Sequence, residues 1–333
     1  MPRETVGVVG AGAFGTALAD LIARHGRNVV VWSQTRAVVD EINGERTNRE
    51  RLPGVELAPQ LQATNDPQEL ARRARFIIVA VPSTDVRTRA HALGDFVDGS
   101  HILVHAIGAL AVPRETPTGE LLVTELLREE TPVIRVGALA GPTLPRDLVE
   151  SRYASMVAAS AFDEVTAEAR RLLAVPRCLR IYRGADPGGV ELAAALSGAY
   201  TLAIGIADVL EVGPGLRAVL VTRATAEAAR LGAAAGVDPK TFYGLAGLGN
   251  LLVRTAPDSS SKNYRLGRAL GRGEPIASLT LTEGARAAQA GKRMADRLGV
   301  RMPVISALAG VIAGELSPEQ AAAAAGDTVA PEE

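Results

Sequence analysis

Three glycines near the N-terminus, Gly10, Gly12 and Gly15, have the spacing of a phosphate-binding turn. They follow the apolar run Val6–Val9 and open a segment of helical period, Ala13–His25. In such a strand–turn–helix unit the first glycine permits the tight turn, the second lets the backbone approach a pyrophosphate, and the third lets helix and strand pack closely. The helix N-terminus adds free N–H groups and a positive dipole end. A dinucleotide site is therefore predicted on Gly10, Ala11, Gly12, Ala13, Phe14 and Gly15.

The end of the next strand-like run bears on which dinucleotide is bound. That run is Asn28–Trp32, and Ser33, Gln34, Thr35 and Arg36 follow it. An acidic residue here would bind the ribose 2′-hydroxyl of NAD, whereas an arginine accommodates the 2′-phosphate of NADP. Two interpretations of Arg36 stay open: it holds such a phosphate together with the hydroxyls, or it is a solvated residue that begins the next helix. The predicted cofactor is NAD or NADP.

The elements that must position this loop follow from the pattern of the first half of the chain. Short β-branched runs alternate there with segments of helical period, which predicts a parallel sheet buried on both faces. The strand-like runs are Val6–Val9, Asn28–Trp32, Phe76–Val81, His101–His105, Val133–Leu139, Ser155–Ala159 and Leu179–Tyr182.

A Gly/Pro cluster at residues 184–189 separates this half from a second region of different character. Beyond Val190 the sequence is rich in Ala and Leu, with no convincing strand. Breaks come at Gly213-Pro214, Asp238-Pro239 and Met302-Pro303, as expected for helix boundaries. The sequence predicts an α/β protein with a dinucleotide-binding domain at 1–185 and an all-helical domain at 186–333.

Composition limits the classes of partner. The chain has 333 residues, 47% of them hydrophobic, and a formal net charge of −1, without a basic stripe. This argues against a nucleic-acid or membrane binder. Cys178 is the only cysteine, and His25, His91 and His101 lack ligand spacing, so no metal site is predicted. The sequence shows no signal-peptide pattern, and no uninterrupted apolar stretch is long enough to span a membrane. We therefore expect a cytoplasmic protein.

Motifs along almost the whole chain resemble those of bacterial NAD(P)-dependent glycerol-3-phosphate dehydrogenases. They are Gly10–Ala19, Asn48–Pro53, Ala63–Asp66, Val79–Ser83, Gly141–Thr143, Val190–Leu192, Gly244–Gly249, Ser261–Asn263 and Glu283-Gly284. The resemblance implies a Rossmann-type domain, a helical substrate domain, and hydride exchange between nicotinamide and glycerol 3-phosphate or dihydroxyacetone phosphate. It also implies that Pro82 and Glu283 bind the cofactor together with the glycine loop, Ser33 and Arg36.

The same resemblance implies that the reaction's charged groups are replaced here. The family uses two lysines and an aspartate, and these positions fall on Ile107, Ser197 and Asn250. Lysine is rare in this chain, but a bias against lysine would favour arginine and keep the charge. Isoleucine cannot donate a proton, and a serine hydroxyl stays neutral near pH 7. The usual means of polarising a carbonyl and stabilising an alkoxide is missing, so loss of the family reaction is predicted.

Five other residues could serve an altered pocket. Arg254, on a presumed loop after Asn250, could form an anion site with Lys262 and Arg265; alternatively, these are solvated basic side chains. The family's phosphate-gripping Arg-Asn pair falls on Lys262 and Asn263. His105 lies two residues before Ile107 on the expected strand, so it is either a replacement acid or a hydrogen-bonded structural residue.

Three functions compete on this evidence. The first is a cofactor-binding homologue without dehydrogenase activity, acting as a cofactor sensor, as a homodimer or through a regulatory protein partner. The second is an active oxidoreductase that acts on glycerol 3-phosphate or another small phosphorylated or anionic ligand. The third is a structural or interaction protein whose glycines serve packing alone. Titration with NADH and NADPH separates the first two from the third.

Overall fold

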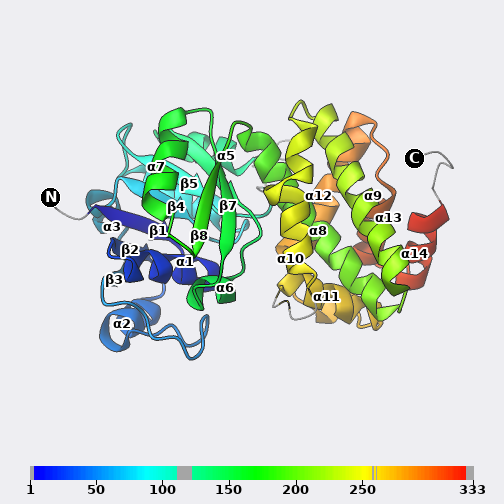
Figure 1. Cartoon of the computed structure of the whole chain (residues 1–333), viewed down its shortest axis with the longest axis horizontal. Helices are drawn as coiled ribbons and strands as arrows, with labels where there is room; N and C mark the ends of the chain where they lie inside the picture. The colour runs from blue at the N-terminus through cyan, green and yellow to red at the C-terminus, as the bar shows by residue number, and fades with distance from the viewer. Residues whose placement is uncertain (1–3, 111–121, 257–258, 260, 328–333) are drawn as a thin grey trace. The chain divides into compact units, whose positions relative to one another are not determined.

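An eight-stranded sheet forms the core of the first of two structural units. The structure, a computed structural model of the chain, describes residues 4–110, 122–256, 259 and 261–327 (Figure 1). The first unit contains the described residues of 1–107 and 121–187, and the second contains those of 108–120 and of 188 onward. Within the described residues, the first unit is α/β and the second is helical, which confirms the predicted fold class.

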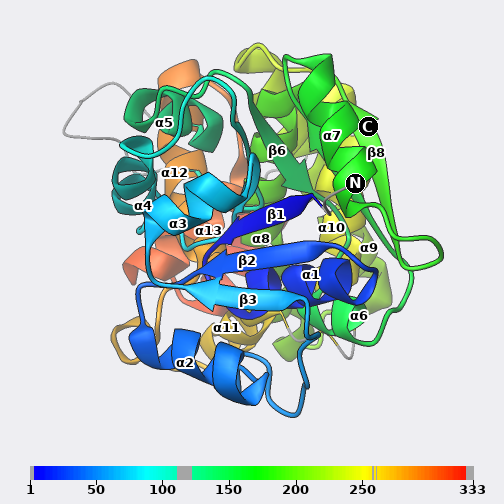
Figure 2. The ribbon, with the colours of Figure 1, turned by 90° about the vertical axis from the view of Figure 1, so that its left-hand side faces the viewer.

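The sheet has the strand order β3-β2-β1-β4-β5-β6-β7-β8. Neighbouring strands are parallel except for the antiparallel pair β6–β7. The strands are β1 Thr5–Val9, β2 Asn28–Trp32, β3 Leu61–Thr64, β4 Phe76–Val79, β5 Ile102–His105, β6 Val136–Ala140, β7 Ala154–Ala159 and β8 Leu179–Gly184. Figure 2 shows β1, β2 and β3 side by side in this order. Because chain order reverses at β1 and β4, the carboxyl ends of these strands form a topological switch point.

Strand β3 was missed by the sequence analysis. Its four residues, Leu61–Thr64, include no Val or Ile and only one β-branched residue, Thr64, so the β-branched signature of the other runs is weak here. The strand forms because its backbone pairs with β2 in parallel register, from Val29 opposite Leu61 to Trp32 opposite Thr64. A buried Leu61 and Ala63 on one face complete the half-buried pattern of this edge strand.

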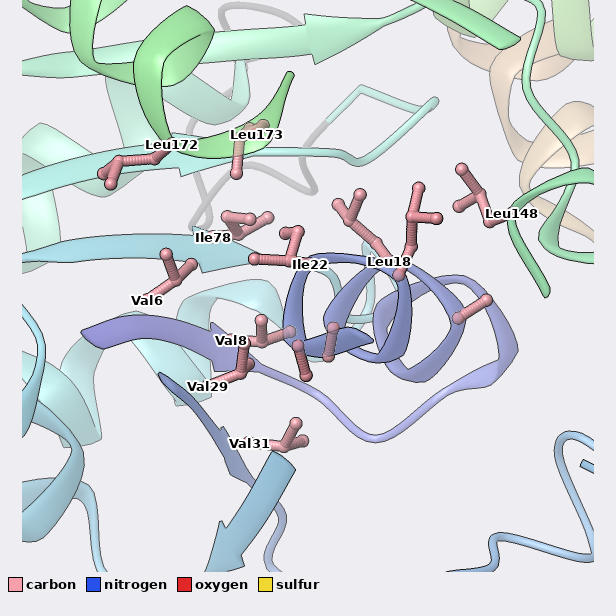
Figure 3. Close-up of a cluster of buried hydrophobic side chains, with 14 of the residues drawn as sticks. Val6, Val8, Leu18, Ile22, Val29, Val31, Ile78, Leu148, Leu172 and Leu173 are labelled. Carbon is pink, nitrogen blue, oxygen red and sulfur yellow. The ribbon is translucent and has the colours of Figure 1, made fainter. Parts of the chain in front are cut away.

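Helices cover the sheet between successive strands. They are α1 Ala13–Arg24, α2 Arg36–Glu45, α3 Pro67–Arg73, α4 Val86–Gly94, α5 Val123–Glu130, α6 Pro145–Val149 and α7 Asp163–Leu173. Leu18 and Ile22 of α1 lie among Val8 of β1 and Ile78 of β4 in the core cluster (Figure 3). Both helix side chains are almost fully buried, at 0% and 1% exposure. This packing fixes the start of α1, which carries the glycine loop, against the ends of β1 and β4.

The second unit consists of helices in its described part. They are α8 Pro187–Val209, α9 Gly213–Ala234, the 3₁₀-helix η1 Pro239–Tyr243, the π-helix η2 Leu245–Gly249, α10 Asn250–Arg254, α11 Lys262–Gly271, the 3₁₀-helix η3 Ile276–Ser278, α12 Glu283–Leu298, α13 Pro303–Ala313 and α14 Pro318–Asp327. Helix α8 is long and apolar enough to cross a membrane by length and composition alone, although Glu191 and Asp208 interrupt its apolar run. However, 94% of its most apolar window is buried within the protein, as expected of a core helix.

Glycines bring three of these helices into backbone contact. A Cβ built on Gly284 at the start of α12 would lie 2.3 Å from the carbonyl oxygen of Gly198 in α8. A Cβ on Gly267 of α11 would lie 2.1 Å from the carbonyl oxygen of Leu202, also in α8. No side chain fits at these crossings, so α11 and α12 each lie directly against the α8 backbone.

Candidate functional site

Two of the three fingerprint glycines are required by local packing. Gly10 has a φ of +109°, and a Cβ there would lie 2.6 Å from the carbonyl oxygen of Ala80. A Cβ on Gly15 would lie 2.4 Å from the carbonyl oxygen of Gly10. Gly12 differs: a Cβ there would meet nothing within 4 Å. The middle glycine therefore faces open space, which is what close approach of a pyrophosphate to the backbone requires.

The N-terminus of α1 is built to receive an anion. Gly12 is its N-cap, no side chain caps it, and its first turn contains no acidic residue. The N–H groups of that turn have no partner within the helix, and the helix dipole makes this end positive. These features fit the phosphates of a dinucleotide, and the assignment of these residues to the cofactor stays a prediction.

Asn48 is hydrogen-bonded to the glycine loop and to α1. Its Nδ2 donates to the carbonyl oxygen of Ala11 and to Oγ1 of Thr16, both at 3.0 Å, and the side chain is fully buried. The sequence analysis included Asn48 among the family motifs but gave it no role. An asparagine thirty-odd residues from a glycine loop carries no local signal, so only the tertiary structure reveals this contact.

At the end of β2 the structure places Ser33 and Arg36 on either side of the turn into α2. Ser33 Oγ accepts a hydrogen bond from the backbone N–H of Thr35 at 3.3 Å. Arg36 is the first residue of α2, and its Nε lies 3.0 Å from Oδ1 of Asp40, with both side chains largely exposed. Exposed ion pairs of this kind contribute little stability, so Arg36 can exchange this partner for a ligand.

The carboxyl ends of β4 and β5 carry the remaining candidates of the first unit. Pro82 lies exposed just after β4, and its carbonyl accepts from the N–H of Asp85. His105 ends β5 and is 1% exposed, with its Nδ1 3.3 Å from the backbone N–H of Ile107. Because Ile107 lies beyond the strand, the expectation that the two side chains share a strand face is wrong. The hydrogen bond makes Nδ1 an acceptor, so a neutral ring carries its proton on Nε2.

In the second unit, three candidate residues meet in one hydrogen-bonded chain. Arg254 Nε donates to Asn250 Oδ1 at 2.7 Å, and Asn250 Nδ2 donates to Ser197 Oγ at 3.1 Å. The serine hydroxyl in turn donates to the carbonyl oxygen of Ala194 at 2.8 Å. Ser197 and Asn250 are buried, at 3% and 1% exposure. A neutral amide and a hydroxyl thus occupy the two positions that the resemblance aligns with a lysine and an aspartate.

Arg254 completes this group from the helix α10, not from a loop as the sequence analysis assumed. Asn250 and Arg254 are the first and last residues of that helix, and a spacing of four residues puts their side chains on one face. This spacing was the signal that could have predicted the pair. Burial lowers the pKa of Arg254 to about 10, so the guanidinium stays charged at neutral pH.

Gly108 lies beside the same guanidinium. A Cβ on Gly108 would be 3.6 Å from Arg254 Nη2, 3.7 Å from the carbonyl oxygen of Ala194 and 4.0 Å from Arg254 Nη1. No role was predicted for Gly108 from the sequence. It places its backbone, without a side chain, next to this face of the arginine.

The other predicted binding residues of the second unit lie on α11 and at the start of α12. Lys262 and Arg265 are exposed on α11, and no hydrogen bond or ion pair among the described residues links them to Arg254. Asn263 is buried, and its Oδ1 accepts from the backbone N–H of Gly284 at 3.1 Å. Glu283, which begins α12, forms an ion pair with Arg286. Within the described ranges, no group of three or more His, Cys, Asp or Glu could hold a metal ion.

The parallel sheet with its glycine loop, followed by a helical unit, defines the class of nucleotide-binding dehydrogenase folds. The family described as NAD-dependent glycerol-3-phosphate dehydrogenase matches with its N-terminal part over residues 5–166 and with its C-terminal part over residues 186–323. The chain belongs to this family.

Named relatives agree with this assignment. A glycerol-3-phosphate dehydrogenase [NAD(P)+] from Geobacter sulfurreducens is 35% identical over 306 residues, covering 90% of each chain. One from Bacillus velezensis is 34% identical over 313 residues, covering 92% of this chain and 89% of the relative.

Solved structures agree as well. The crystal structure of glycerol-3-phosphate dehydrogenase from Coxiella burnetii is 27% identical, with a TM-score of 0.88 over 96% of this chain and 98% of that one. A ketopantoate reductase from Ralstonia eutropha is 19% identical with a TM-score of 0.62, over 95% of this chain and 99% of that one. The second likeness concerns the fold alone.

Proposed function

We propose that this chain binds NAD or NADP through its glycine loop and does not carry out the lysine-dependent exchange between glycerol 3-phosphate and dihydroxyacetone phosphate. The binding half is supported by the open space at Gly12, the uncapped start of α1 and the family's named cofactor. A bound dinucleotide would supply a nicotinamide ring that accepts or donates a hydride. In this proposal the protein senses the cofactor, or acts through a partner, in the cytoplasm.

The observation that carries the second half is the neutral pair Ser197–Asn250. Asn250 Nδ2 donates to Ser197 Oγ, and neither side chain can carry the positive charge or the carboxylate that the resemblance assigns to these positions. Ile107, the third such position, is a buried apolar side chain with 5% exposure. Removing one donor to a developing oxyanion typically slows a reaction about a hundred- to a thousandfold. The rate losses from replacements within one catalytic unit are not additive, so the combined loss is smaller than the product of the individual factors.

Cofactor binding is tested by titrating NADH and NADPH against the fluorescence of Trp32, the only tryptophan, which ends β2. Saturable binding of at least one dinucleotide is expected. Gly12→Ala should weaken it about tenfold or more, because the added methyl takes the space for the pyrophosphate. The matched control is Gly44→Ala, since a Cβ on Gly44 also meets nothing within 4 Å. Saturation by neither dinucleotide would refute the proposal.

Loss of the family reaction is tested by a rescue. The wild type should reduce dihydroxyacetone phosphate at least about a hundredfold more slowly than the Geobacter sulfurreducens relative assayed alongside it. The combination Ile107→Lys, Ser197→Lys and Asn250→Asp should raise the rate, more so with Arg254→Thr added to clear the space beside Asn250. A wild type that matches the relative would overturn this part of the proposal and leave cofactor binding intact.

A second candidate function is an oxidoreductase with another anionic substrate. The charged Arg254 favours it, because a guanidinium can polarise a carbonyl group in place of a lysine. His105 is the remaining candidate acid, with Nε2 as its donor atom. A screen of small ketones and 2-oxo acids with both cofactors tests this function. If turnover is found and His105→Gln leaves its pH profile unchanged, His105 is not the acid.

A further inference from the structure

Arg254 is a partly buried cation without an acidic partner in the described part of the chain. No carboxylate there forms an ion pair with it, and its lowered pKa has burial as its only cause. Charged side chains that leave water are normally paired, because an isolated buried charge is costly. The residue best placed to pair with it, at position 250, is an asparagine whose amide oxygen accepts a hydrogen bond but supplies no charge.

The hydrogen-bonded chain behind Arg254 fixes its orientation. Donation runs in one direction, from Arg254 to Asn250 to Ser197 and on to the backbone carbonyl of Ala194. Each donor along this path has an acceptor, so the amide of Asn250 has one favoured orientation. Only the Nε of the guanidinium is used. The remaining N–H bonds lie on the two Nη nitrogens, which form no hydrogen bond with the described residues.

Gly108, which has no side chain, borders those nitrogens: a Cβ there would lie 3.6 Å from Nη2 and 4.0 Å from Nη1. Nε is held by Asn250, so the guanidinium is an oriented fork whose two Nη nitrogens remain available to a ligand. Forks of this geometry bind carboxylate and phosphate groups through two parallel hydrogen bonds.

We propose that Arg254 anchors an oxyanion site in the second unit, where its two Nη nitrogens bind a carboxylate or phosphate group of a small ligand. Asn250 and Ser197 are positioning residues that hold the fork in place. The inference deepens the proposed function and rests on it for the assignment of this altered site. It also gives the asparagine a role: an aspartate at position 250 would neutralise the arginine internally and compete with the ligand.

The experiment uses the full chain and three probes, oxalate, acetate and inorganic phosphate, each titrated by calorimetry at constant ionic strength. The carboxylate and phosphate arms decide which oxyanion is preferred. Saturable binding of at least one probe is expected in the wild type. Arg254→Gln should abolish it, and Arg254→Lys should weaken it about tenfold, because lysine retains the charge but loses the fork. Asn250→Asp should weaken it at least tenfold although the cation remains.

Two controls keep the result specific. Arg268→Gln removes a charge of the same kind from an exposed position in α11, and it should leave the affinity unchanged. Thermal unfolding and NADH titration of every variant separate loss of the anion site from loss of the fold. No saturable binding of any probe to the wild type, or an equal loss in Arg268→Gln and Arg254→Gln, would overturn the inference. NADH binding that persists in either case leaves the proposed function standing.

Discussion

The glycine loop of the first unit and the Ser197–Asn250–Arg254 group of the second differ in the kind of atoms that they present to a ligand. The loop presents backbone N–H groups at a helix start, and its shape depends on two glycines that have no room for a side chain. The second group presents side-chain atoms only. A site made of backbone cannot change without disturbing the fold around it, whereas side chains can be exchanged on an unchanged scaffold. This difference would let a cofactor loop persist in the first unit while side chains of the second group are exchanged.

Gly12 refines this contrast. Packing accounts for Gly10 and Gly15, and a purely structural protein would need them too. Packing does not account for Gly12, whose added Cβ would touch nothing, and whose φ of −72° any residue can adopt. Its smallness is explained by a ligand that approaches the backbone. Among the three competing functions, this favours those that bind a dinucleotide.

The largest expected effect comes from Gly15→Ala. The new methyl would lie 2.4 Å from a backbone oxygen that cannot move independently, so we expect a loss of about 3 kcal/mol in the free energy of unfolding. This loss should exceed the gain in helix propensity of about 1 kcal/mol. Urea denaturation measures the free energy of unfolding. The matched control is Gly12→Ala, which should change this free energy by less than about 1 kcal/mol. Equal tolerance of both substitutions would remove the distinction between packing and binding glycines.

The second prediction concerns a side chain that the fold of the second unit does depend on. Glu227 of α9 is 1% exposed, and its Oε1 accepts from the backbone N–H of Val304 at 2.8 Å. Desolvation raises its pKa to about 7, with Tyr200 and Arg230 as its other titratable neighbours. The carboxyl is therefore harder to ionise in the folded state than in the unfolded chain, whose pKa is 4.5.

The sign of the pH dependence follows from this shift. The stability associated with the protonated carboxyl is fully present below pH 4.5 and is lost as the pH rises through about 7. Glu227→Gln cannot ionise, so its stability relative to the wild type should improve by about 2 kcal/mol between pH 5 and pH 8. Thermal unfolding across this pH range measures the difference. A constant offset at every pH would show that Glu227 does not titrate there.

A smaller loss is expected from Asn250→Ala. The substitution removes the acceptor of the Arg254 Nε and the donor to Ser197 Oγ. Leaving such groups unsatisfied costs about 1–3 kcal/mol, and we expect about 1.5 kcal/mol because Arg254 is partly exposed and can recruit water. Urea denaturation measures the loss, and NADH binding should be unaffected. An accompanying loss of NADH affinity would contradict the independence of the two sites.

The smallest effect distinguishes the two cofactors at Arg36. Arg36→Ala should change stability by less than about 0.5 kcal/mol, because its ion pair with Asp40 is exposed. If the guanidinium meets the ribose 2′-phosphate, NADPH should bind about fivefold more weakly and NADH unchanged. Competition between the two dinucleotides gives the ratio of the NADPH and NADH affinities directly. An unchanged ratio would assign Arg36 to the solvated start of α2.

Much of the fold could be predicted from the sequence because it depends on local patterns. The β-branched runs predicted seven of the strands, and Gly-Pro and Asp-Pro pairs marked the starts of α9 and η1. Strand β3 was missed because its stability comes from pairing with β2 and not from its own residues. The assigned roles of Pro82, Lys262, Asn263 and Glu283 stay predictions.

The site was harder to predict, because its contacts join residues distant in sequence. Ser197 and Asn250 lie 53 positions apart and still share a hydrogen bond. No periodicity places Asn48 under the glycine loop either. Conversely, His105 and Ile107 were expected on one strand face, and the chain leaves the sheet between them. Residue types predicted which charged groups are replaced, and only the fold shows that Arg254 is hydrogen-bonded to Asn250.

The glycine crossings of the second unit have a consequence for substitutions in α8. Gly284 and Gly267 hold the backbones of α12 and α11 against α8, and any side chain at these points would push them apart. Ser197 lies in α8 next to one of these crossings, so its Cα and Cβ are held where a longer side chain would begin. A substitution at position 197 therefore changes the side chain that meets Asn250 while the glycine crossings keep the α8 backbone in place.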